Sequence, residues 1–381
     1  MTAGSPVPAT TDRKPSGGVA GSATADPADA GVGLRLDGVF KVLGGRTIVD
    51  NLDLDVGRGE LVCLLGPSGC GKTTTLRIIG GFLEPDRGRL TINGVDHTHS
   101  RPERRPTAMV FQNYALWPHM SVTKNIAFGL KVRGLTGAQI REKVGWALDL
   151  LGLQHHRDSM PARISGGEQQ RVALARALVL EPDVLLMDEP LSNLDAKLRV
   201  QVRETIKEIQ QRLGITTVFV THDQEEALSI ADRVAVMNDG RIEQLAPPAD
   251  LYRLPRTTFV AGFVGSMNIV PTPPAAGGIP LDDGALLPCR NFSGADGDTC
   301  WVRPEDLQVT EPDAPGTARG VVLRVIPRGH YREVLVQSHG TRLRAYTSAD
   351  PGSEQLIGLR ADRALVYSGG VLVEDRAEPR R

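Results

Sequence analysis

Hydrophobic and polar positions follow one pattern between Leu34 and about Asn238, where short apolar runs alternate with amphipathic segments of helical period. The apolar runs predict buried strands at 61–65, 108–111, 184–187, 217–220 and 233–237. The amphipathic segments predict helices at 72–80, 139–151, 168–180, 196–213 and 224–230. This alternation indicates an α/β domain whose mixed, largely parallel central sheet carries helices on both faces. Residues 34–40 and 90–95 are expected to add antiparallel strands at its flank.

A second pattern begins after about residue 245, where prolines and glycines become frequent and apolar residues gather in short runs. These runs predict β-strands at 301–310, 319–326, 333–338, 341–346 and 362–367. Short strands separated by turn residues are typical of small barrels, so we expect a small all-β, OB-like domain here. The Pro- and Gly-rich stretch 271–299 is predicted to be a loop excursion.

The chain of 381 residues is long enough for two or three domains. Residues 1–30 are nearly all small or polar, so we expect them to form a disordered tail. The change of pattern divides the rest into an α/β domain at 31–244, a linker at 245–270 and a β domain at 271–376.

Charge and apolar content exclude several classes of protein. Lys and Arg total 44 while Asp and Glu total 45, so no basic surface for a nucleic-acid partner is expected. No apolar run is long enough to span a bilayer, and the N-terminus lacks the apolar segment of a secretory signal. Cys63, Cys70, Cys289 and Cys300 are expected to be free thiols in a reducing cytoplasm, with a Cys289–Cys300 disulfide as the less favoured alternative.

A glycine-rich loop joins the predicted strand 61–65 to the predicted helix 72–80. It fits the pattern G-x-x-x-x-G-K-[ST], in which backbone N–H groups and a helix N-terminus point at phosphate oxygens. Lys72 is expected to reach the β- and γ-phosphates of a nucleotide, and the Thr73 hydroxyl is expected to hold Mg²⁺. The residues expected to bind the nucleotide are Gly66, Pro67, Ser68, Gly69, Cys70, Gly71, Lys72, Thr73 and Thr74. The helix N-terminus is also expected to lower the pKa of the Cys70 thiol.

Two acidic residues follow the apolar strand at 184–187, at the edge where open α/β sheets bind ligands. Asp188 is placed to hold Mg²⁺, and Glu189 is placed to act as general base toward an attacking water.

A second turn suited to anions, Ser165-Gly166-Gly167, stands at the start of the predicted helix 168–180. Ordinary helix capping accounts for part of this sequence. Because one nucleotide does not need two such turns, we expect this turn to bind the γ-phosphate of a nucleotide held by another copy of the chain.

Together these motifs resemble those of ABC transporter ATP-binding subunits. The run 165–171 resembles the family's signature, Phe111-Gln112 its Q-loop, 192–195 its D-loop and 221–223 its switch-histidine region. The resemblance implies an α/β P-loop NTPase, the ABC cassette, with a helical subdomain at about 113–180. It also implies that ATP and Mg²⁺ are the cofactors, that Gln112 contacts Mg²⁺ and the attacking water, and that His222 contacts the γ-phosphate and holds Glu189.

The resemblance further implies the partners of the chain. Two copies would close head to tail around two ATP molecules at the cytoplasmic face of the cell membrane. Two transmembrane permease subunits would dock near 117–120 and 125–130, and an extracytoplasmic binding protein would deliver the solute. Residues 259–268 and 302–305 resemble parts of importers with a regulatory C-terminal (TOBE) domain, which take up sugars, polyamines, ferric iron or quaternary amines. A soluble ABC ATPase and an exporter ATPase are the alternatives.

The sequence departs from the family pattern at three positions. Ile164 and Glu168 replace the Leu and Gln that are usual in the signature, and Glu168 is expected beyond the anion turn. Leu43 stands where the family stacks an aromatic residue on adenine, so apolar contact would replace stacking.

His155 and His156 are neighbours in the sequence and are expected to be solvated rather than metal-binding.

Overall fold

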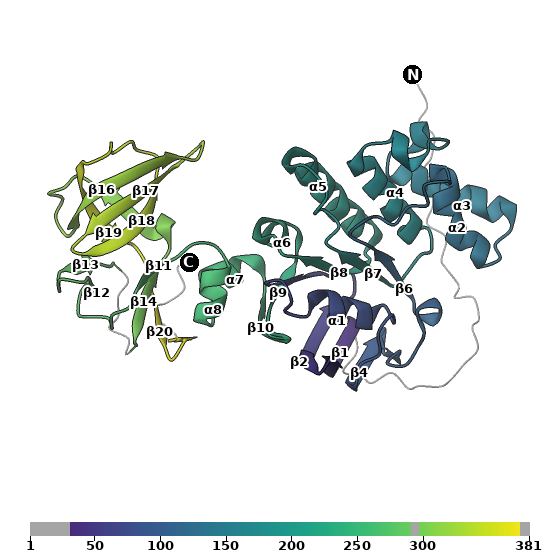
Figure 1. Cartoon of the computed structure of the whole chain (residues 1–381), viewed down its shortest axis with the longest axis horizontal. Coiled ribbons are helices and arrows are strands. Elements are labelled where there is room, and N and C mark those ends of the chain that lie inside the picture. The colour runs from purple at the N-terminus through teal and green to yellow at the C-terminus, as the bar shows by residue number, and fades with distance from the viewer. Residues whose placement is uncertain (1–30, 291–296, 374–381) are drawn as a thin grey trace, which may run out of the picture.

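The computed structural model describes residues 31–290 and 297–373, which form a larger α/β domain and a smaller β domain (Figure 1). The predicted tail at 1–30 lies outside the described residues. Helices α7 (Pro248–Arg253) and α8 (Thr258–Phe263) connect the two domains. The sequence predicted this stretch as a linker but did not predict its helices.

A six-stranded sheet forms the centre of the larger domain, in the order β10-β9-β3-β8-β7-β6. Its strands are β3 (Leu61–Leu65), β6 (Thr107–Val110), β7 (Val184–Asp188), β8 (Thr216–Thr221), β9 (Arg233–Asn238) and β10 (Arg241–Ala246). The first five are parallel where they pair, and β10 pairs with β9 antiparallel. All five predicted central strands are therefore confirmed, and the antiparallel edge strand β10 was missed.

The central strands are continuous apolar runs because both faces of the sheet are covered. On β3, Leu61, Cys63 and Leu65 belong to one hydrophobic core, whereas Val62 and Leu64 belong to another. The first core lies against α2 (Val122–Val132), α3 (Gly137–Leu150), α4 (Gly166–Leu178), α5 (Ala196–Leu213) and α6 (Gln224–Ile230).

The second core includes α1 (Lys72–Ile79) and a separate antiparallel sheet of order β2-β1-β4-β5. That sheet consists of β1 (Val32–Leu43), β2 (Arg46–Gly57), β4 (Arg87–Ile92) and β5 (Val95–Asp96). The antiparallel flank expected from 34–40 and 90–95 is thus present. Helices on one face and a helix with this sheet on the other leave the ends of the parallel strands as the open edge.

The smaller domain is an antiparallel half-barrel of two main sheets around its own core. One sheet contains β15 (Leu307–Thr310), β16 (Ala318–Pro327), β17 (Arg332–Ser338), β18 (Thr341–Thr347) and β19 (Leu356–Ala361). The other contains β11 (Asn268–Val270), β14 (Thr299–Val302), β20 (Leu365–Ser368) and β21 (Val371–Leu372). The expected all-β class is confirmed.

Two details of this domain differ from the sequence prediction. The predicted strand 301–310 is split, because Pro304 begins a short 3-10 turn at Pro304–Asp306 where a ladder N–H is missing. The predicted loop 271–299 contains a hairpin of β12 (Gly278–Pro280) and β13 (Leu286–Pro288), whose Ile279 and Leu287 are fully buried. The frequent Pro and Gly concealed this hairpin.

Arg303 joins the β domain to the connecting segment. Its guanidinium donates to the carbonyl oxygens of Tyr252 at 2.8 Å and Val264 at 2.5 Å, and stacks 3.9 Å from the Tyr252 ring. Gly265 has a φ of +79°, and a Cβ there would lie 2.7 Å from the Arg303 Nη1. Glycine at 265 therefore allows the chain to pass close to this buried arginine.

We expect Arg303→Ala to destabilise the protein by about 2–4 kcal/mol, because several buried carbonyl oxygens would lose a charged donor. Thermal or urea unfolding measures the change. Arg319→Ala is the matched control, because Arg319 pairs with Asp313 at an exposed site and should change stability by less than about 0.5 kcal/mol. Equal stability of the two variants would contradict this role of Arg303.

Candidate nucleotide site

The loop between β3 and α1 has the backbone that its glycines predict. Gly69 and Gly71 have φ values of +84° and +102°, which residues with a Cβ rarely adopt. A Cβ on Gly71 would also lie 2.5 Å from the carbonyl oxygen of Ile48 in β2. The C-terminal end of the loop therefore lies close against β2. Ser68 and Gly69, at the tip of the loop, are exposed.

Lys72, the first residue of α1, is buried against this loop, with only 6% of its surface exposed. Its Nζ donates to the carbonyl oxygens of Gly66 at 2.7 Å and Pro67 at 2.9 Å. A buried ammonium normally has an anionic partner, and here the two oxygen acceptors are neutral backbone carbonyls. The arrangement therefore suits a ligand that brings negative charge, such as the phosphates of a nucleotide.

Thr73 and Asp188 meet at the start of α1 and the end of β7. The Thr73 hydroxyl donates to Asp188 Oδ1 at 3.0 Å. Burial raises the pKa of Asp188 above its usual value, and the nearby Glu189 carboxylate acts in the same direction. A hydroxyl and a carboxylate that meet at one point offer the hard oxygen ligands that Mg²⁺ prefers.

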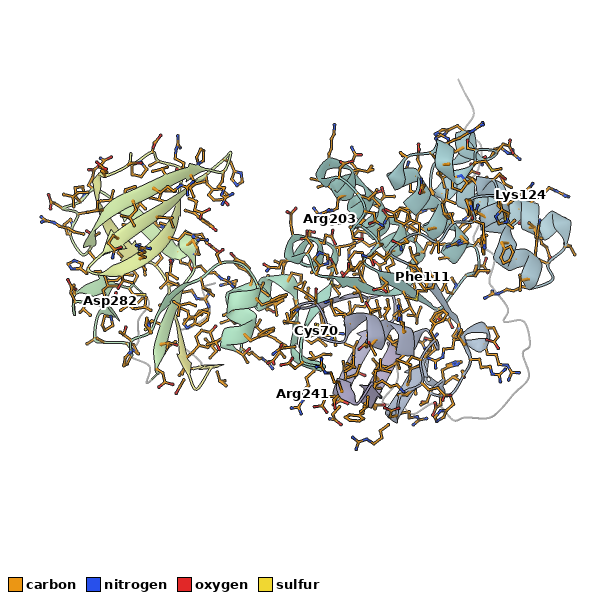
Figure 2. The ribbon with its side chains drawn as sticks, viewed as in Figure 1. Cys70, Phe111, Lys124, Arg203, Arg241 and Asp282 are labelled. Carbon is orange, nitrogen blue, oxygen red and sulfur yellow. The ribbon has the colours of Figure 1, made fainter. Side chains whose placement is uncertain are left out.

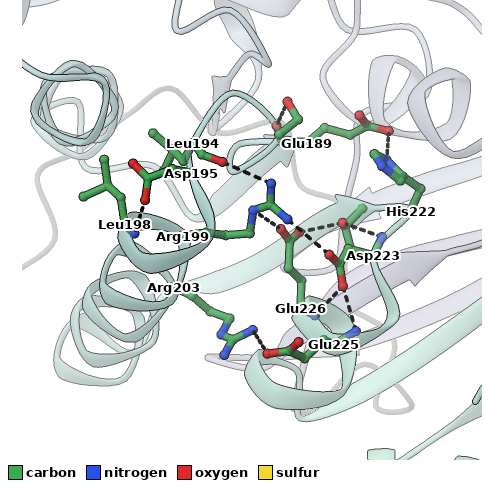
Figure 3. Close-up of polar contacts among 12 residues, drawn as sticks. Glu189, Leu194, Asp195, Leu198, Arg199, Arg203, His222, Asp223, Glu225 and Glu226 are labelled. Atoms are coloured by element: carbon green, nitrogen blue, oxygen red, sulfur yellow. Dashed lines mark hydrogen bonds and ion pairs between the residues drawn. The ribbon is translucent and has the colours of Figure 1, made fainter. Parts of the chain in front are cut away.

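Glu189 lies at the junction of three predicted motifs. Its Oε2 accepts a hydrogen bond from Gln112 Nε2 at 3.2 Å. Its Oε1 lies 3.1 Å from His222 Nδ1 (Figure 3). Its backbone has the unusual φ of 43°, and its N–H donates to the carbonyl of Val220 in β8 at 3.0 Å. The fold therefore brings Gln112 and His222, both predicted to be catalytic, into contact with Glu189.

The Ser165–Gly167 turn lies elsewhere. Within the described parts of the chain, no hydrogen bond joins it to the loop at 66–74. Ser165 is exposed at the N-cap of α4, and a Cβ on Gly167 would lie 2.8 Å from Leu198 of α5. Ser165 thus faces outward, whereas Gly166 is half-buried and Gly167 is buried.

Glu168 turns back onto this N-cap. Its Oε2 accepts hydrogen bonds from the Ser165 N–H at 2.7 Å and hydroxyl at 2.8 Å, which closes a capping box. Its Oε1 lies 2.8 Å from His156 Nε2. The hydrogen bonds from Ser165 and His156 lower the pKa of Glu168, although burial opposes them. These hydrogen bonds therefore offset the cost of burying the Glu168 carboxylate, which is unusual in the signature.

The prediction that both histidines are solvated is right for His155, which is exposed, and wrong for His156, which contacts Glu168. The donor atoms of His155, His156 and Glu168 lie within 4.8 Å of one another. Since the Glu168 carboxylate already hydrogen-bonds to Ser165 and His156, we assign no metal to these three residues.

Leu43 ends β1 and is 41% exposed, beside the β1–β2 turn. An exposed leucine can offer apolar contact to a base, as expected, but no ring for stacking.

The prediction that the pKa of the Cys70 thiol is lowered is wrong. Cys70 lies in the loop just before α1 in the larger domain (Figure 2), with 4% of its surface exposed. Burial raises the pKa of its thiol, and the nearby Lys72 opposes this only in part. The sequence showed the helix N-terminus but not the burial that outweighs it.

Sequence reasoning missed two further groups near the site. Arg199, in the first turns of α5, contacts the carbonyl oxygen of Leu194 and the carboxylates of Asp223 and Glu226 (Figure 3). Glu226 is buried in α6. Both look like ordinary polar positions of amphipathic helices, so no sequence signal distinguished them.

No helix within the described residues is long and apolar enough to cross a membrane.

Comparison with known proteins places these motifs in a family context. Residues 49–192 match the sequence profile described as ABC transporter. The chain is 48% identical over 340 residues to the spermidine/putrescine import ATP-binding protein PotA of Frankia alni, covering 82% of this chain and 73% of that protein. It is 46% identical to the sn-glycerol-3-phosphate import ATP-binding protein UgpC of Chromohalobacter salexigens, covering 87% and 88%.

Two further similarities agree with these. The chain is 43% identical to the Fe(3+) ions import ATP-binding protein FbpC of Escherichia coli O157:H7, covering 81% of this chain and 89% of that protein. The solved structure of cbiO1 from Clostridium perfringens, part of the ABC transporter complex cbiONQ, superposes with a TM-score of 0.56 at 30% identity. It covers 59% of this chain and 92% of that chain, and thus supports the fold of one domain.

We expect Cys70 to react slowly with iodoacetamide near neutral pH, because its raised pKa keeps the thiolate scarce and burial limits access. The rate should increase as the pH rises toward and above the ordinary thiol pKa. Peptide mass spectrometry after timed labelling measures it, with urea-unfolded protein as the control. Native labelling as fast as unfolded labelling would contradict the burial argument.

Proposed function

This chain belongs to the ATP-binding proteins of ABC transporters, and we propose that it hydrolyses ATP in a head-to-tail dimer that drives solute import. The observation that carries the proposal is the contact of Glu189 with both Gln112 and His222, beside the Thr73–Asp188 pair. An adjacent base, its two orienting groups and a cation site are the parts that phosphoryl transfer to water requires.

Loop 66–74 would bind the triphosphate. Its backbone N–H groups and the N-terminus of α1 favour anions, and Lys72 would exchange its carbonyl acceptors for phosphate oxygens. Thr73 and Asp188 would hold Mg²⁺, with Gln112 as a further oxygen ligand. Bound there, Mg²⁺ neutralises charge on the phosphates. Leu43 would contact the base.

Glu189 would accept a proton from the attacking water as the water oxygen bonds to the γ-phosphorus and the bond to the ADP oxygen breaks. His222 would fix one carboxylate oxygen and contact the γ-phosphate, while Gln112 would orient the water. The left-handed backbone of Glu189 supports this role, because it turns the side chain away from the path of β7.

The second copy would supply Ser165, Gly166 and Gly167. Ser165 is exposed and, among the described residues, makes no hydrogen bond to the phosphate loop of its own chain, which supports a role in a site on another chain. Two such sites related by a two-fold axis would make the dimer depend on bound ATP.

The proposed partners are two transmembrane permease subunits on the helical subdomain and an extracytoplasmic binding protein, with this chain at the cytoplasmic membrane face. The similar proteins are named for import of polyamines, ferric ions, glycerol-3-phosphate and diacetylchitobiose. Because one cassette type serves such different solutes, we propose that other subunits select among polyamine, ferric iron, sugar or quaternary amine. Purification in mild detergent tests this: permease chains should copurify, whereas a soluble ABC ATPase would purify without them.

We expect Glu189→Gln to lower kcat for ATP by roughly a hundredfold or more, because the general base is lost while its shape is kept. ATP binding should persist, and the variant should form an ATP-dependent dimer, measured by size-exclusion chromatography with light scattering. Adding Ser165→Ala and Gly167→Leu to this variant should abolish the dimer. A variant that binds ATP but stays monomeric, also with its permease present, would contradict the proposal.

We expect Leu43→Tyr to tighten ATP binding by about 1 kcal/mol, roughly fivefold, through stacking on adenine. Isothermal titration with ATP and GTP measures affinity and base preference. The titrations use the Glu189→Gln background, in which Lys72 is unchanged and ATP is not turned over. Leu43→Met is the control, since it changes shape without adding a ring. Micromolar affinity with strong ATP preference in the parent protein would show that stacking is not missing.

A further inference from the structure

Arg199 occupies a position between two loops of the proposed site. It lies in α5, directly after the D-loop 192–195, and its Nη2 donates to the carbonyl oxygen of Leu194 at 3.1 Å. Its Nη1 donates to Asp223 Oδ2 at 3.4 Å, and its Nε lies 3.5 Å from Glu226 Oε1 (Figure 3). One guanidinium thus connects the D-loop with the segment that follows His222.

The residues on both sides of His222 belong to this network. Thr221 donates its hydroxyl to Glu226 Oε2 at 2.6 Å and accepts the Asp223 N–H at 3.0 Å. Asp223 also caps α6 through the N–H groups of Glu225 and Glu226. Any shift of Arg199 relative to α6 therefore acts on the backbone that carries His222.

Together with Glu189, these contacts close a ring. Ser192 at the start of the D-loop donates its hydroxyl to the carbonyl oxygen of Glu189 at 3.0 Å, and His222 contacts the Glu189 carboxylate at 3.1 Å. The ring runs from Glu189 through the D-loop to Arg199, then through Asp223 to His222 and back. Its geometry fixes the D-loop and the switch histidine relative to each other.

Arg199 is hard to replace in this ring because it pairs with the buried carboxylate of Glu226. The Glu226 side chain is 5% exposed, and burial raises its pKa. Arg199 is the cation in contact with it within the described residues, whereas Arg203 and Lys207 on the same helix pair with the exposed carboxylates of Glu225 and Asp232. A planar guanidinium can serve a carbonyl and two carboxylates at once, which a lysine ammonium cannot do with the same geometry.

We propose that Arg199 is a positioning residue that transmits the movement of the D-loop, when the second copy docks, to His222 and so to Glu189. This inference rests on the proposed function. It makes hydrolysis sensitive to whether the partner copy is in place, because the D-loop lies beside the Ser165–Gly167 turn: a Cβ on Gly166 would lie 3.3 Å from Leu194.

The first test compares steady-state ATP hydrolysis of Arg199→Met with its matched control Arg203→Met, one turn further along α5. Arg199→Met should lower kcat by about ten- to a hundredfold with KM for ATP within about twofold, because the phosphate loop is intact and only His222 is misplaced. Arg203→Met should retain near-normal kcat. Arg199→Lys should recover part of kcat. Equal kcat in the Met variants would overturn the proposal.

The second test separates positioning from folding. Arg199→Met leaves Glu226 without its cation and should lower the melting temperature, whereas Arg199→Met combined with Glu226→Gln should restore most of it because the unpaired buried charge is gone. The D-loop contact is still absent in the double variant, so kcat should stay low. Recovery of kcat together with the melting temperature would show a purely structural role and overturn the inference.

A third measurement distinguishes the two proposals. In the Glu189→Gln background, ATP-dependent dimerisation should occur with Arg199 and should persist with Arg199→Met, since the proposed defect lies after docking. Absence of any dimer with Arg199 present would overturn the proposed function itself. A dimer lost only in Arg199→Met would overturn the positioning role and assign Arg199 to the interface.

Discussion

The hydrogen bonds that share the Glu189 carboxylate between Gln112 and His222 are the contacts on which the rest of the site depends. They hold because β6, β7 and β8 are parallel neighbours, so the segments after their C-terminal ends emerge at one edge. The φ of 43° at Glu189 then directs its side chain between the other two. A strained backbone at this point is stable because β8 and the D-loop hold it from both sides.

The two-sided burial of the sheet explains why this edge is rigid. Each central strand divides its side chains between two cores, so a strand cannot shift without disturbing both. Helix α4 adds a second constraint, since Arg176 donates to the carbonyl oxygens of Tyr114 and Ala115, which have φ values of 57° and 47°. The Q-loop side of the site is thereby anchored to the helix that carries the signature turn.

The connection to the β domain begins close to the same edge. The Gly265 N–H donates to the side-chain oxygen of Gln224, which lies two residues after His222, at 2.8 Å. Arg303 of the β domain holds the carbonyl oxygens of Val264 and Ser266 on either side of that glycine. The segment after the switch histidine is therefore tied to the D-loop through Arg199 and to the second domain through Gln224.

The sequence was enough to predict the fold class, the phosphate loop, the paired acids of β7 and the family, because these depend on local spacing and on continuous apolar strands. It did not determine the pKa of Cys70, the contact of Glu168 with His156, the hairpin at 278–288 or the network of Arg199. Each of these depends on burial or on a partner distant in sequence. They could be seen only in the folded chain, because desolvation and long-range contact are properties of packing and leave no periodic signal along the sequence.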